Sequence, residues 1–283
     1  MQNKPSRHQK PFPAKETAFL LGDEKVRTLS EYEKDYYSRN TLIPEIGEEG
    51  QAKLLDSSVL VIGSGGLGSP ALYYLAASGL GEIGIADSDD VEVSNLQRQI
   101  LHGVDDVGTE KTVSAAESIR RLRPDVKLNL YQERIESDNG PEIIRQYDFV
   151  IEATDNFESK FLINDMCVSE GKAYTHAGIL GMFGQVMTIV PGESPCYRCV
   201  FQKMPAPGKV KGTAQLGVLG TVPGVLGTIQ ATEALKYLLD LGGLLTGRLL
   251  TYNAAQMKFR EVALPEDQRC PVCSSTSDVK AAG

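Results

Sequence analysis

A glycine-rich turn between an apolar strand and a helix is the feature that most constrains how this chain can fold. The segment VLVIGSGGLGS carries four glycines: Gly63, Gly65, Gly66 and Gly68. The backbone must turn tightly here and approach a phosphate with no Cβ in the way. The helix that follows offers free N–H groups and the positive end of its dipole. The turn therefore predicts a nucleotide-binding sheet.

An acidic residue strengthens this interpretation. Asp87 ends the next predicted strand, about 20 residues beyond the turn, where a carboxylate binds ribose hydroxyls. The glycines and Asp87 fit an NAD-dependent dehydrogenase equally well, so the chemistry must be decided by other residues.

Strand and helix patterns alternate through the first two-thirds of the chain. Residues 69–78 are predicted as a helix, with Ser69 as a candidate N-cap and Pro70 at the first helical position. Predicted strands lie at residues 58–62, 82–87, 126–131 and 149–153, and further helices at 110–122 and from 157 to 167. This alternation is typical of a Rossmann-like, doubly wound parallel sheet.

The last third of the chain has a different pattern. Residues 183–190 and 249–259 each look like an antiparallel strand, and residues 217–241 hold a long apolar helix. We therefore expect an α/β fold whose sheet is mostly parallel, with antiparallel strands in its C-terminal region.

Composition excludes several classes of protein. The chain has 283 residues, 41% of them hydrophobic and 23% charged, as in an ordinary soluble protein. No apolar run reaches the ~18 residues that a membrane span needs. The polar N-terminus lacks the apolar stretch of a signal peptide, so we expect a cytoplasmic protein. A net charge of −8 argues against nonspecific nucleic-acid binding.

Four of the five cysteines form two C-x-x-C pairs, which indicates a metal site in a cytosolic chain. The four are Cys196, Cys199, Cys270 and Cys273. Four thiolates fill the tetrahedron that Zn²⁺ prefers and leave no open position for a substrate water, so we expect a structural zinc that clasps the C-terminal region. Redox pairs or free thiols are the alternative. The fifth cysteine, Cys167, is expected to be a small buried hydrophobe.

The run DSDDVEVSNLQRQ, which begins at Asp87, carries a specific resemblance. Behind the glycine turn it resembles the adenylation core of the ubiquitin-activating superfamily, and in particular the bacterial ThiF/MoeB/HesA family. The resemblance extends from about residue 35 to 273. It also takes in the motifs YYSRN, GTEK, TDN, CYRC, GVLGTVPGVLGTIQATEALK and CPVC, in that order. Chance does not account for so many ordered motifs.

This resemblance implies an ATP-dependent adenylyltransferase, in which a carboxylate attacks the α-phosphate and pyrophosphate leaves. It implies that Gly66 approaches the nucleotide, that Asp87 binds ribose, and that Asp155 holds Mg²⁺ with Asn156 beside it. The other nucleotide-binding positions that it implies are Ser94, Asn95, Arg98 and Lys111. The last three of these would line the triphosphate.

Arg39, in the YYSRN motif, is similar to an arginine that reaches the phosphates from the neighbouring subunit. The resemblance therefore also implies a homodimer, in which Arg39 joins Arg98, Lys111 and Asp155 as the catalytic set.

The chemistry agrees with these residue types. A carboxylate is already ionised at pH 7, so its attack needs no general base. Catalysis then consists of positioning two anions and neutralising charge, which calls for Arg, Lys and Mg²⁺. The three histidines, His8, His102 and His176, lie outside the motifs.

Two other classes stay open as alternatives. An NAD(P)-dependent oxidoreductase would have no use for Arg98, Lys111 and Asp155 around a triphosphate, nor for the four cysteines. A noncatalytic scaffold, such as the inactive half of a heterodimeric activating enzyme, would be expected to lose the catalytic charges that this chain retains.

The chain departs from the family pattern at one chemically important position. Many members have a cysteine where this chain reads Gly212-Thr213-Ala214-Gln215, and no cysteine lies between residues 200 and 269. We expect the chain to stop at adenylation, and a separate sulfurtransferase or cysteine desulfurase to consume the adenylate. The sequence leaves open whether Ala214 is natural or replaces an active-site cysteine.

The resemblance implies a small ubiquitin-like β-grasp carrier protein ending in Gly-Gly as the partner. The Gly/Pro/Lys-rich residues 204–220 would suit a mobile loop over the nucleotide, where a flexible tail threads; a plain surface loop is the alternative. The sequence does not choose between molybdopterin, thiamin thiazole, another sulfur metabolite and tRNA thiolation as the pathway.

We expect one adenylation domain flanked by two tails. Residues 1–30 would form a mobile extension, residues 31–273 the domain and residues 274–283 a flexible tail. Within the domain, residues 57–180 would form the nucleotide-binding half, and residues 181–273 the carrier-binding and zinc half.

Overall fold

The computed structural model describes residues 27–206, 209, 213–265, 267 and 269–274. Most of the predicted N-terminal extension, part of the 204–220 loop and nearly all of the predicted tail therefore lie outside the described residues. From Arg27 onward the chain contacts the domain. The Arg27 guanidinium lies 2.6 Å from a carboxylate oxygen of Glu33 and 3.3 Å from one of Asp56, and Leu29 is buried.

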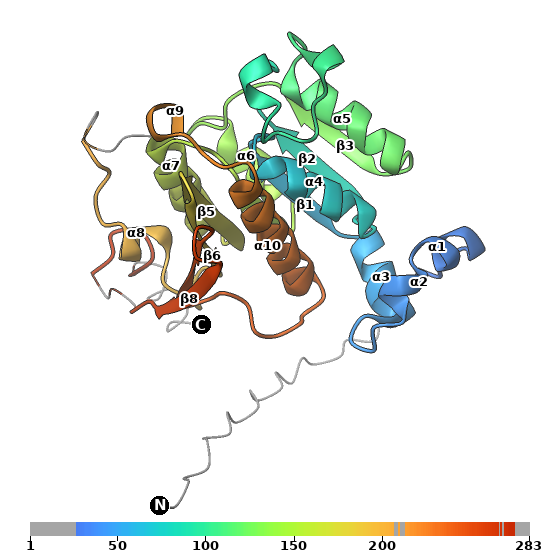
Figure 1. The fold of residues 1–283 in the computed structure, drawn as a ribbon. Coiled ribbons are helices and arrows are strands. Elements are labelled where there is room, and N and C mark those ends of the chain that lie inside the picture. Colours follow the sequence, from blue (N-terminus) through green and yellow to red (C-terminus); the bar gives the residue numbers. More distant parts are fainter. Residues whose placement is uncertain (1–26, 207–208, 210–212, 266, 268, 275–283) are drawn as a thin grey trace, which may run out of the picture.

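A sheet of eight strands organises the described residues (Figure 1). Its strands are β1 (Ser58–Ile62), β2 (Glu82–Ala86), β3 (Lys127–Tyr131), β4 (Phe149–Glu152), β5 (Tyr174–Leu180), β6 (Phe183–Ile189), β7 (Arg248–Asn253) and β8 (Lys258–Ala263). The spatial order is β3-β2-β1-β4-β5-β6-β7-β8. The first five strands of this order are parallel, and β6, β7 and β8 are antiparallel. The predicted mostly parallel sheet with antiparallel C-terminal strands is confirmed.

Helices cover both faces of the parallel part of the sheet. Residues of α4, α5 and α10 pack on one face, and residues of α6 and α7 on the other. The helices of the described residues are α1 (Glu31–Tyr36), α2 (Ser38–Thr41), α3 (Gly47–Leu55), α4 (Gly68–Ala77), α5 (Lys111–Leu122), α6 (Gly140–Arg145), α7 (Phe157–Ser169), α8 (Tyr197–Val200), α9 (Thr213–Leu216) and α10 (Thr221–Leu238), with 3₁₀ turns η1 (Val93–Asn95) and η2 (Val104–Asp106). None of these helices, over the residues described, combines the length and the apolar character that crossing a bilayer requires.

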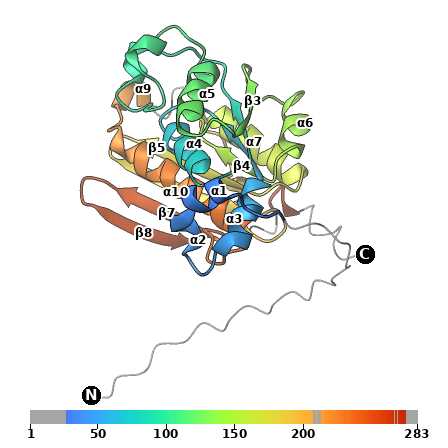
Figure 2. The same ribbon diagram turned by 90° about the vertical axis from the view of Figure 1, so that its right-hand side faces the viewer.

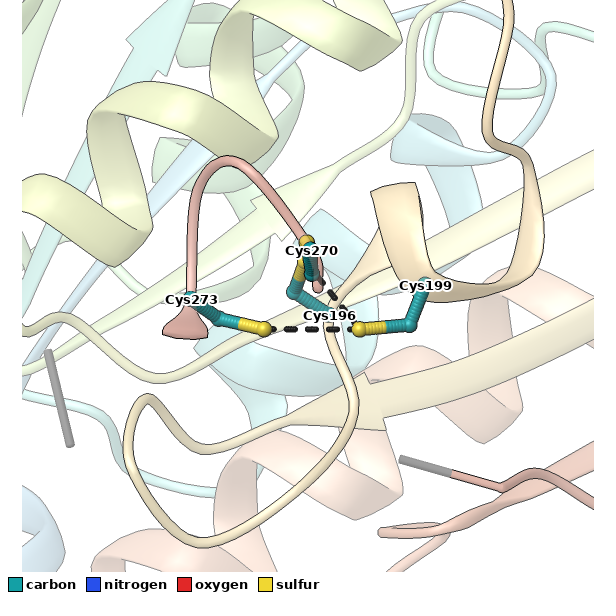
Figure 3. A group of neighbouring side chains, drawn as sticks. All are labelled: Cys196, Cys199, Cys270 and Cys273. Carbon is teal, nitrogen blue, oxygen red and sulfur yellow. Dashed lines mark hydrogen bonds between the residues drawn. The ribbon is translucent and has the colours of Figure 1, made fainter. Parts of the chain in front are cut away.

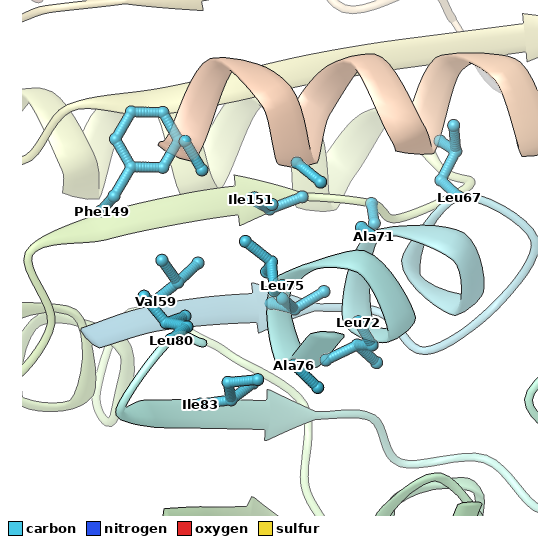
Figure 4. Packing of buried hydrophobic residues seen from close by; sticks show 14 of the residues in the cluster. Val59, Leu67, Ala71, Leu72, Leu75, Ala76, Leu80, Ile83, Phe149 and Ile151 are labelled. Atoms are coloured by element: carbon cyan, nitrogen blue, oxygen red, sulfur yellow. The ribbon is translucent and has the colours of Figure 1, made fainter. Parts of the chain in front are cut away.

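Successive side chains of β1 and β4 enter two different cores, because side chains alternate across a strand. Val59 and Ile151 pack under α4 and α10 (Figure 4), whereas Leu60 and Val150 pack against α6 and α7 on the other face. Both faces of these strands are therefore buried, which explains why β1 is one continuous apolar run.

Helix α10 lies directly against α4. A Cβ at Gly227 would lie 2.1 Å from the carbonyl oxygen of Leu67, so this close contact of backbones requires glycine. Buried polar side chains fix α10 across the sheet. Gln230 Nε2 donates to the Glu152 carbonyl at 2.8 Å, and Glu233 Oε2 accepts from the Leu245 N–H at 2.6 Å.

The start of α4 differs from the prediction. Ser69 does not cap the helix, because α4 begins one residue earlier with Leu67 as its N-cap, and Pro70 falls at the third helical position. The glycine turn runs directly into the helix, and the Ser69 hydroxyl donates back to the Ser64 carbonyl at 3.3 Å.

The predicted strand over residues 249–259 is wrong in its extent. It is two strands, β7 and β8, joined by a turn at residues 254–257. The Asn253 side chain accepts a hydrogen bond from the Gln256 N–H at 3.2 Å, and Met257 adopts a positive φ of 51°. These two features reverse the chain where the sequence predicts one continuous strand.

Helices α1 to α3 lie at the end of the sheet where β1 begins (Figures 1 and 2). The glycine turn follows the opposite, carboxyl end of β1. The two ends of the parallel strands therefore carry different parts of the predicted site, with Arg39 of α2 at one end and the glycine turn at the other.

Candidate functional site

A cavity of about 150 Å³ opens at the carboxyl ends of β1, β2 and β4. This is the switch point of the sheet, since β2 and β4 lie on opposite sides of β1, and ligands of open α/β sheets bind at such points. Gly63 has φ +100°, and a Cβ there would lie 2.7 Å from the Ala153 carbonyl oxygen. The turn thus brings main-chain N–H groups to the cavity wall only because residue 63 is glycine.

Most of the predicted nucleotide-binding residues line this cavity. They are Gly63, Gly65, Gly66, Asp87, Arg98, Lys111, Asp155 and Asn156. Gly68, Ser94, Asn95 and Arg39 do not line it. The elements therefore bring together residues that are more than 90 positions apart in the chain.

Three of the residues that do not line the cavity support the segments that do. A Cβ at Gly68 would lie 1.9 Å from the Gly63 carbonyl oxygen, so glycine is required for the turn to close. The Ser94 carbonyl accepts from Arg98 Nη1 at 3.0 Å, and Asn95 accepts from the Glu92 N–H at 3.2 Å. Ser94 and Asn95 thus hold the segment that carries Arg98.

Asp87 anchors the glycine turn. Its Oδ2 accepts from the Ser64 N–H at 2.8 Å and from the Ser64 hydroxyl at 3.0 Å, while Oδ1 accepts from the Asp89 N–H at 3.0 Å. A carboxylate offers about four lone-pair sites. Asp87 therefore keeps acceptor capacity toward the cavity that it lines.

Lys111 brings a buried positive charge to the cavity from the first position of α5. Its Nζ lies 2.8 Å from Asp89 Oδ2, and its side chain is 7% exposed while that of Asp89 is 65% exposed. An ion pair with so exposed a partner is weak, so an anion in the cavity can compete with Asp89 for Lys111.

Asp155 follows β4 and carries an exposed carboxylate into the cavity. No side chain or main-chain group of the described residues forms a hydrogen bond or ion pair with it. Asn156 caps α7 by accepting from the Ser159 N–H at 2.8 Å, which fixes the turn beside Asp155. A free carboxylate beside a phosphate-sized cavity fits Mg²⁺, which proteins hold through one or two carboxylates together with substrate phosphates.

A larger cavity of about 510 Å³ adjoins the first one. Thr154, Asp155 and Ile179 line both, so the two cavities meet at the turn after β4. Strands β5 to β8 form most of the rest of its wall, with apolar side chains such as Phe183 and with Lys258 on the outermost strand, and helices α7 and α8 contribute the remainder. No sequence pattern predicted this cavity.

A buried ionic network supports the turn between the cavities. Lys160 Nζ lies 3.0 Å from both carboxylate oxygens of Glu152, and His176 Nδ1 lies 2.7 Å from Glu152 Oε2. Burial alone would raise the pKa of the Glu152 carboxyl, but the Lys160 ammonium and the hydrogen bond from His176 lower that pKa to about 2. Burial lowers the pKa of His176, so its ring is neutral at pH 7.

The four predicted zinc ligands converge (Figure 3). Their sulfur atoms all lie within 4.8 Å of one another. Cys196 Sγ lies 3.8 Å from Cys199 Sγ and 3.6 Å from Cys270 Sγ, and the sulfurs of Cys199 and Cys273 are 3.4 Å apart. Four thiolates at the Zn–S distance of about 2.3 Å would lie about 3.8 Å apart in a tetrahedron, so the cluster fits a zinc ion.

Comparison with known proteins gives a consistent result. The model of the ThiF family matches residues 37–272. The SAMP-activating enzyme E1 of Haloferax volcanii is 49% identical over 239 residues, which are 84% of this chain and 88% of that protein. The sulfur carrier protein adenylyltransferase of Thermus thermophilus is 44% identical over 246 residues, 85% of this chain and 91% of that protein.

A solved structure has the same fold. The crystal structure of E. coli MccB with ATP superposes with a TM-score of 0.75 at 24% identity. The match covers 86% of this chain and 75% of that one.

Proposed function

The chain belongs to the ThiF family, and we propose that it is an ATP-dependent adenylyltransferase that activates the C-terminal glycine carboxylate of a small ubiquitin-like sulfur-carrier protein. The product is the acyl-adenylate, and pyrophosphate is released. One observation carries the proposal: the glycine turn, Arg98, Lys111 and the free carboxylate of Asp155 meet in one cavity that opens into a second.

The smaller cavity takes the nucleotide. The glycine turn and the start of α4 present N–H groups to phosphate oxygens, and Asp87 accepts from the ribose hydroxyls. Arg98 and Lys111 lie along the triphosphate, and Lys111 exchanges the exposed Asp89 for phosphate. Asp155 would hold Mg²⁺, and the bound ion would neutralise negative charge on the phosphates.

The chain's own contribution to the reaction is electrostatic. The attacking carboxylate is ionised at neutral pH, so no side chain has to remove a proton. Arg98 and Lys111 stabilise the negative charge that builds on the phosphates as the carboxylate oxygen approaches. Loss of one such stabilising group costs about 10²-fold in rate.

The larger cavity takes the carrier's C-terminal tail and delivers its carboxylate at Asp155, where the cavities meet. Exposed apolar side chains on the wall of this cavity, Phe157, Leu180 and Phe183, offer a surface for the body of the carrier. Exposed clusters of this kind mark protein contacts.

The four cysteines would hold a structural zinc, because thiolates would fill every coordination position and leave none for a substrate. Arg39 is exposed and lies at the far end of the sheet from the glycine turn. We therefore assign its phosphate contact to the site of a second copy of the chain, in a homodimer. We also place the protein in the cytoplasm.

The product would leave as the adenylate, because alanine stands at position 214 in the segment where many family members have a cysteine. Incubation with ATP and carrier followed by non-reducing electrophoresis tests this step. A thiol-labile adduct between this chain and the carrier would contradict it.

The decisive experiment is ATP–pyrophosphate exchange, measured with a panel of carriers that end in Gly-Gly. We expect one carrier to stimulate exchange, and we expect Asp155→Ala and Arg98→Ala each to reduce it by about 10²-fold with an unchanged fold. Glu158→Ala and Arg120→Ala, which change exposed residues outside both cavities, are the matched controls. Near-normal exchange in Asp155→Ala would refute the role of that carboxylate.

A further inference from the structure

A buried histidine in the wall of the larger cavity has one ring nitrogen without a hydrogen-bond partner among the described residues. His176 of β5 lines that cavity, and its side chain is only 2% exposed. Its Nδ1 is occupied by Glu152 at 2.7 Å, whereas Nε2 has no hydrogen-bond partner among the residues that the structure describes. Leaving a buried polar atom unpaired is costly, so such an atom in a cavity wall indicates a ligand group.

The surrounding charges determine what Nε2 can bind. The ionised carboxylate of Glu152 only accepts hydrogen bonds, so Nδ1 of His176 must carry the proton. The Lys160 ammonium lies 3.0 Å from both oxygens of that carboxylate and keeps it ionised. Lys160 also donates to the carbonyls of Thr154 and Ala177. Since burial keeps the imidazole neutral, Nε2 presents a lone pair to the cavity.

A tyrosine ring lies next to this histidine. The ring of Tyr197 packs 4.5 Å from the ring of His176 and lines the same cavity. Its hydroxyl forms no hydrogen bond within the described part of the chain. The wall therefore pairs an acceptor with a donor, and a peptide unit, with its N–H and its C=O, is complementary to such a pair.

We propose that Nε2 of His176 accepts a hydrogen bond from a main-chain N–H near the C-terminus of the carrier, and that the Tyr197 hydroxyl donates to a neighbouring tail carbonyl. The inference rests on the proposed function and adds the basis of substrate selection. The site takes carboxylates that end a polypeptide, because an acid without an adjacent amide cannot satisfy Nε2. His176 is a positioning residue and takes no proton from the substrate.

Amide-to-ester substitution in the carrier tests this contact directly. Three semisynthetic versions of the carrier that is most active in the exchange assay would each have one of the last three peptide N–H groups replaced by an ester oxygen. With the wild-type enzyme, one version should have a KM about 3- to 10-fold higher than the native carrier, as expected for loss of one hydrogen bond.

The same carriers are then measured with His176→Asn, which keeps an N–H toward Glu152 but lacks the distal nitrogen. This variant should raise the KM for the native carrier, and the sensitive ester should raise it no further. Because an ester also weakens the adjacent carbonyl, the loss of sensitivity in the variant, and not the ester effect alone, identifies His176. Affinity for a fluorescent ATP analogue should be unchanged.

His102→Asn is the matched control. His102 is also buried, with Nδ1 2.8 Å from the Ser114 hydroxyl, but its ring approaches the main chain of Ser64 in the glycine turn and it lines neither cavity. It should leave the KM for the carrier and the ester effect unchanged.

Two results would overturn the inference. One is a wild-type enzyme for which none of the three esters raises KM, a result that does not depend on whether any variant folds. The other is an ester effect that persists in full in His176→Asn. If no carrier stimulates exchange by the wild-type enzyme, the proposed function itself fails, which separates the two conclusions.

Discussion

Replacement of Lys160 by methionine should destabilise the protein strongly, although it removes no part of the nucleotide cavity. Lys160 Nζ lies 3.0 Å from both oxygens of Glu152, 2.7 Å from the Thr154 carbonyl and 2.8 Å from the Ala177 carbonyl. The Glu152 side chain is fully buried. Methionine fills similar space but leaves that carboxylate without its counter-charge.

The magnitude follows from the known cost of breaking a buried ion pair. Removing one partner of such a pair costs about 3–5 kcal/mol in the free energy of unfolding. The pKa of Glu152 agrees in sign: although burial raises it, Lys160 and His176 lower it from 4.5 to about 2, so the network stabilises the ionised carboxylate in the folded state. We therefore expect a loss of roughly 3–5 kcal/mol at pH 7.

Urea unfolding followed by circular dichroism, at a fixed zinc concentration, measures this loss. Lys127→Met is the matched control, since Lys127 Nζ lies 2.9 Å from Glu82 Oε1 but its side chain is 66% exposed. The control should change the free energy of unfolding by less than about 1 kcal/mol. The double variant Glu152→Gln, Lys160→Met should recover part of the loss, because it buries no unpaired charge. A loss below about 1 kcal/mol in Lys160→Met would refute the reasoning.

Three further outcomes follow from the structure. Metal chelation should lower Tm and raise the KM for the carrier, because Tyr197 of the larger cavity lies between Cys196 and Cys199. The affinity for a fluorescent ATP analogue should stay the same, and an equal loss of affinity for both reactants would contradict this. Acidification below about pH 6.5 should reduce stability in urea titrations, because the pKa of His176 is lowered in the folded state and the unfolded chain binds the proton first. Glu152 adds a second loss of stability between pH 4.5 and about 2, where the carboxyl is protonated in the unfolded chain but not in the folded one. If stability between pH 7 and 5 falls no more steeply in the wild type than in His176→Asn, the effect assigned to His176 is refuted. Gly63→Ala should abolish binding of a fluorescent ATP analogue, whereas Gly108→Ala, also at positive φ but with open space around it, should cost only about 1 kcal/mol of stability.

The nucleotide half of the fold was predictable because its signals are local. Strand β1 is a continuous apolar run, and the glycines that follow it leave few alternatives to a turn against a phosphate. The convergence of the four cysteines was also predictable, since the C-x-x-C spacing itself indicates a shared metal.

The strands that line the larger cavity were harder to predict, because they carry mixed signals. Strand β5, YTHAGIL, was not predicted: its first half is buried on both faces, so polar and apolar residues do not alternate, and it includes a histidine. Helix α6, a short helix of six residues after Asn139, was missed as well. His176 was set aside because it lies outside every recognised motif.

The link between His176 and the site is tertiary. Glu152, Lys160 and His176 belong to β4, α7 and β5, and nothing in their sequence separation of 8 and 24 positions indicates that they meet. The available sign was a lone histidine inside a largely apolar segment, and such residues more often have all their hydrogen bonds satisfied within the core.

The contact between α10 and α4 has a mechanical consequence. Since Gly227 lets the two backbones touch, and Gln230 ties α10 to the end of β4, α10 joins the glycine turn to the strands that line the larger cavity. A side chain at position 227 would push α10 away from the Leu67 carbonyl, so a change there would reach both cavities although residue 227 lines neither.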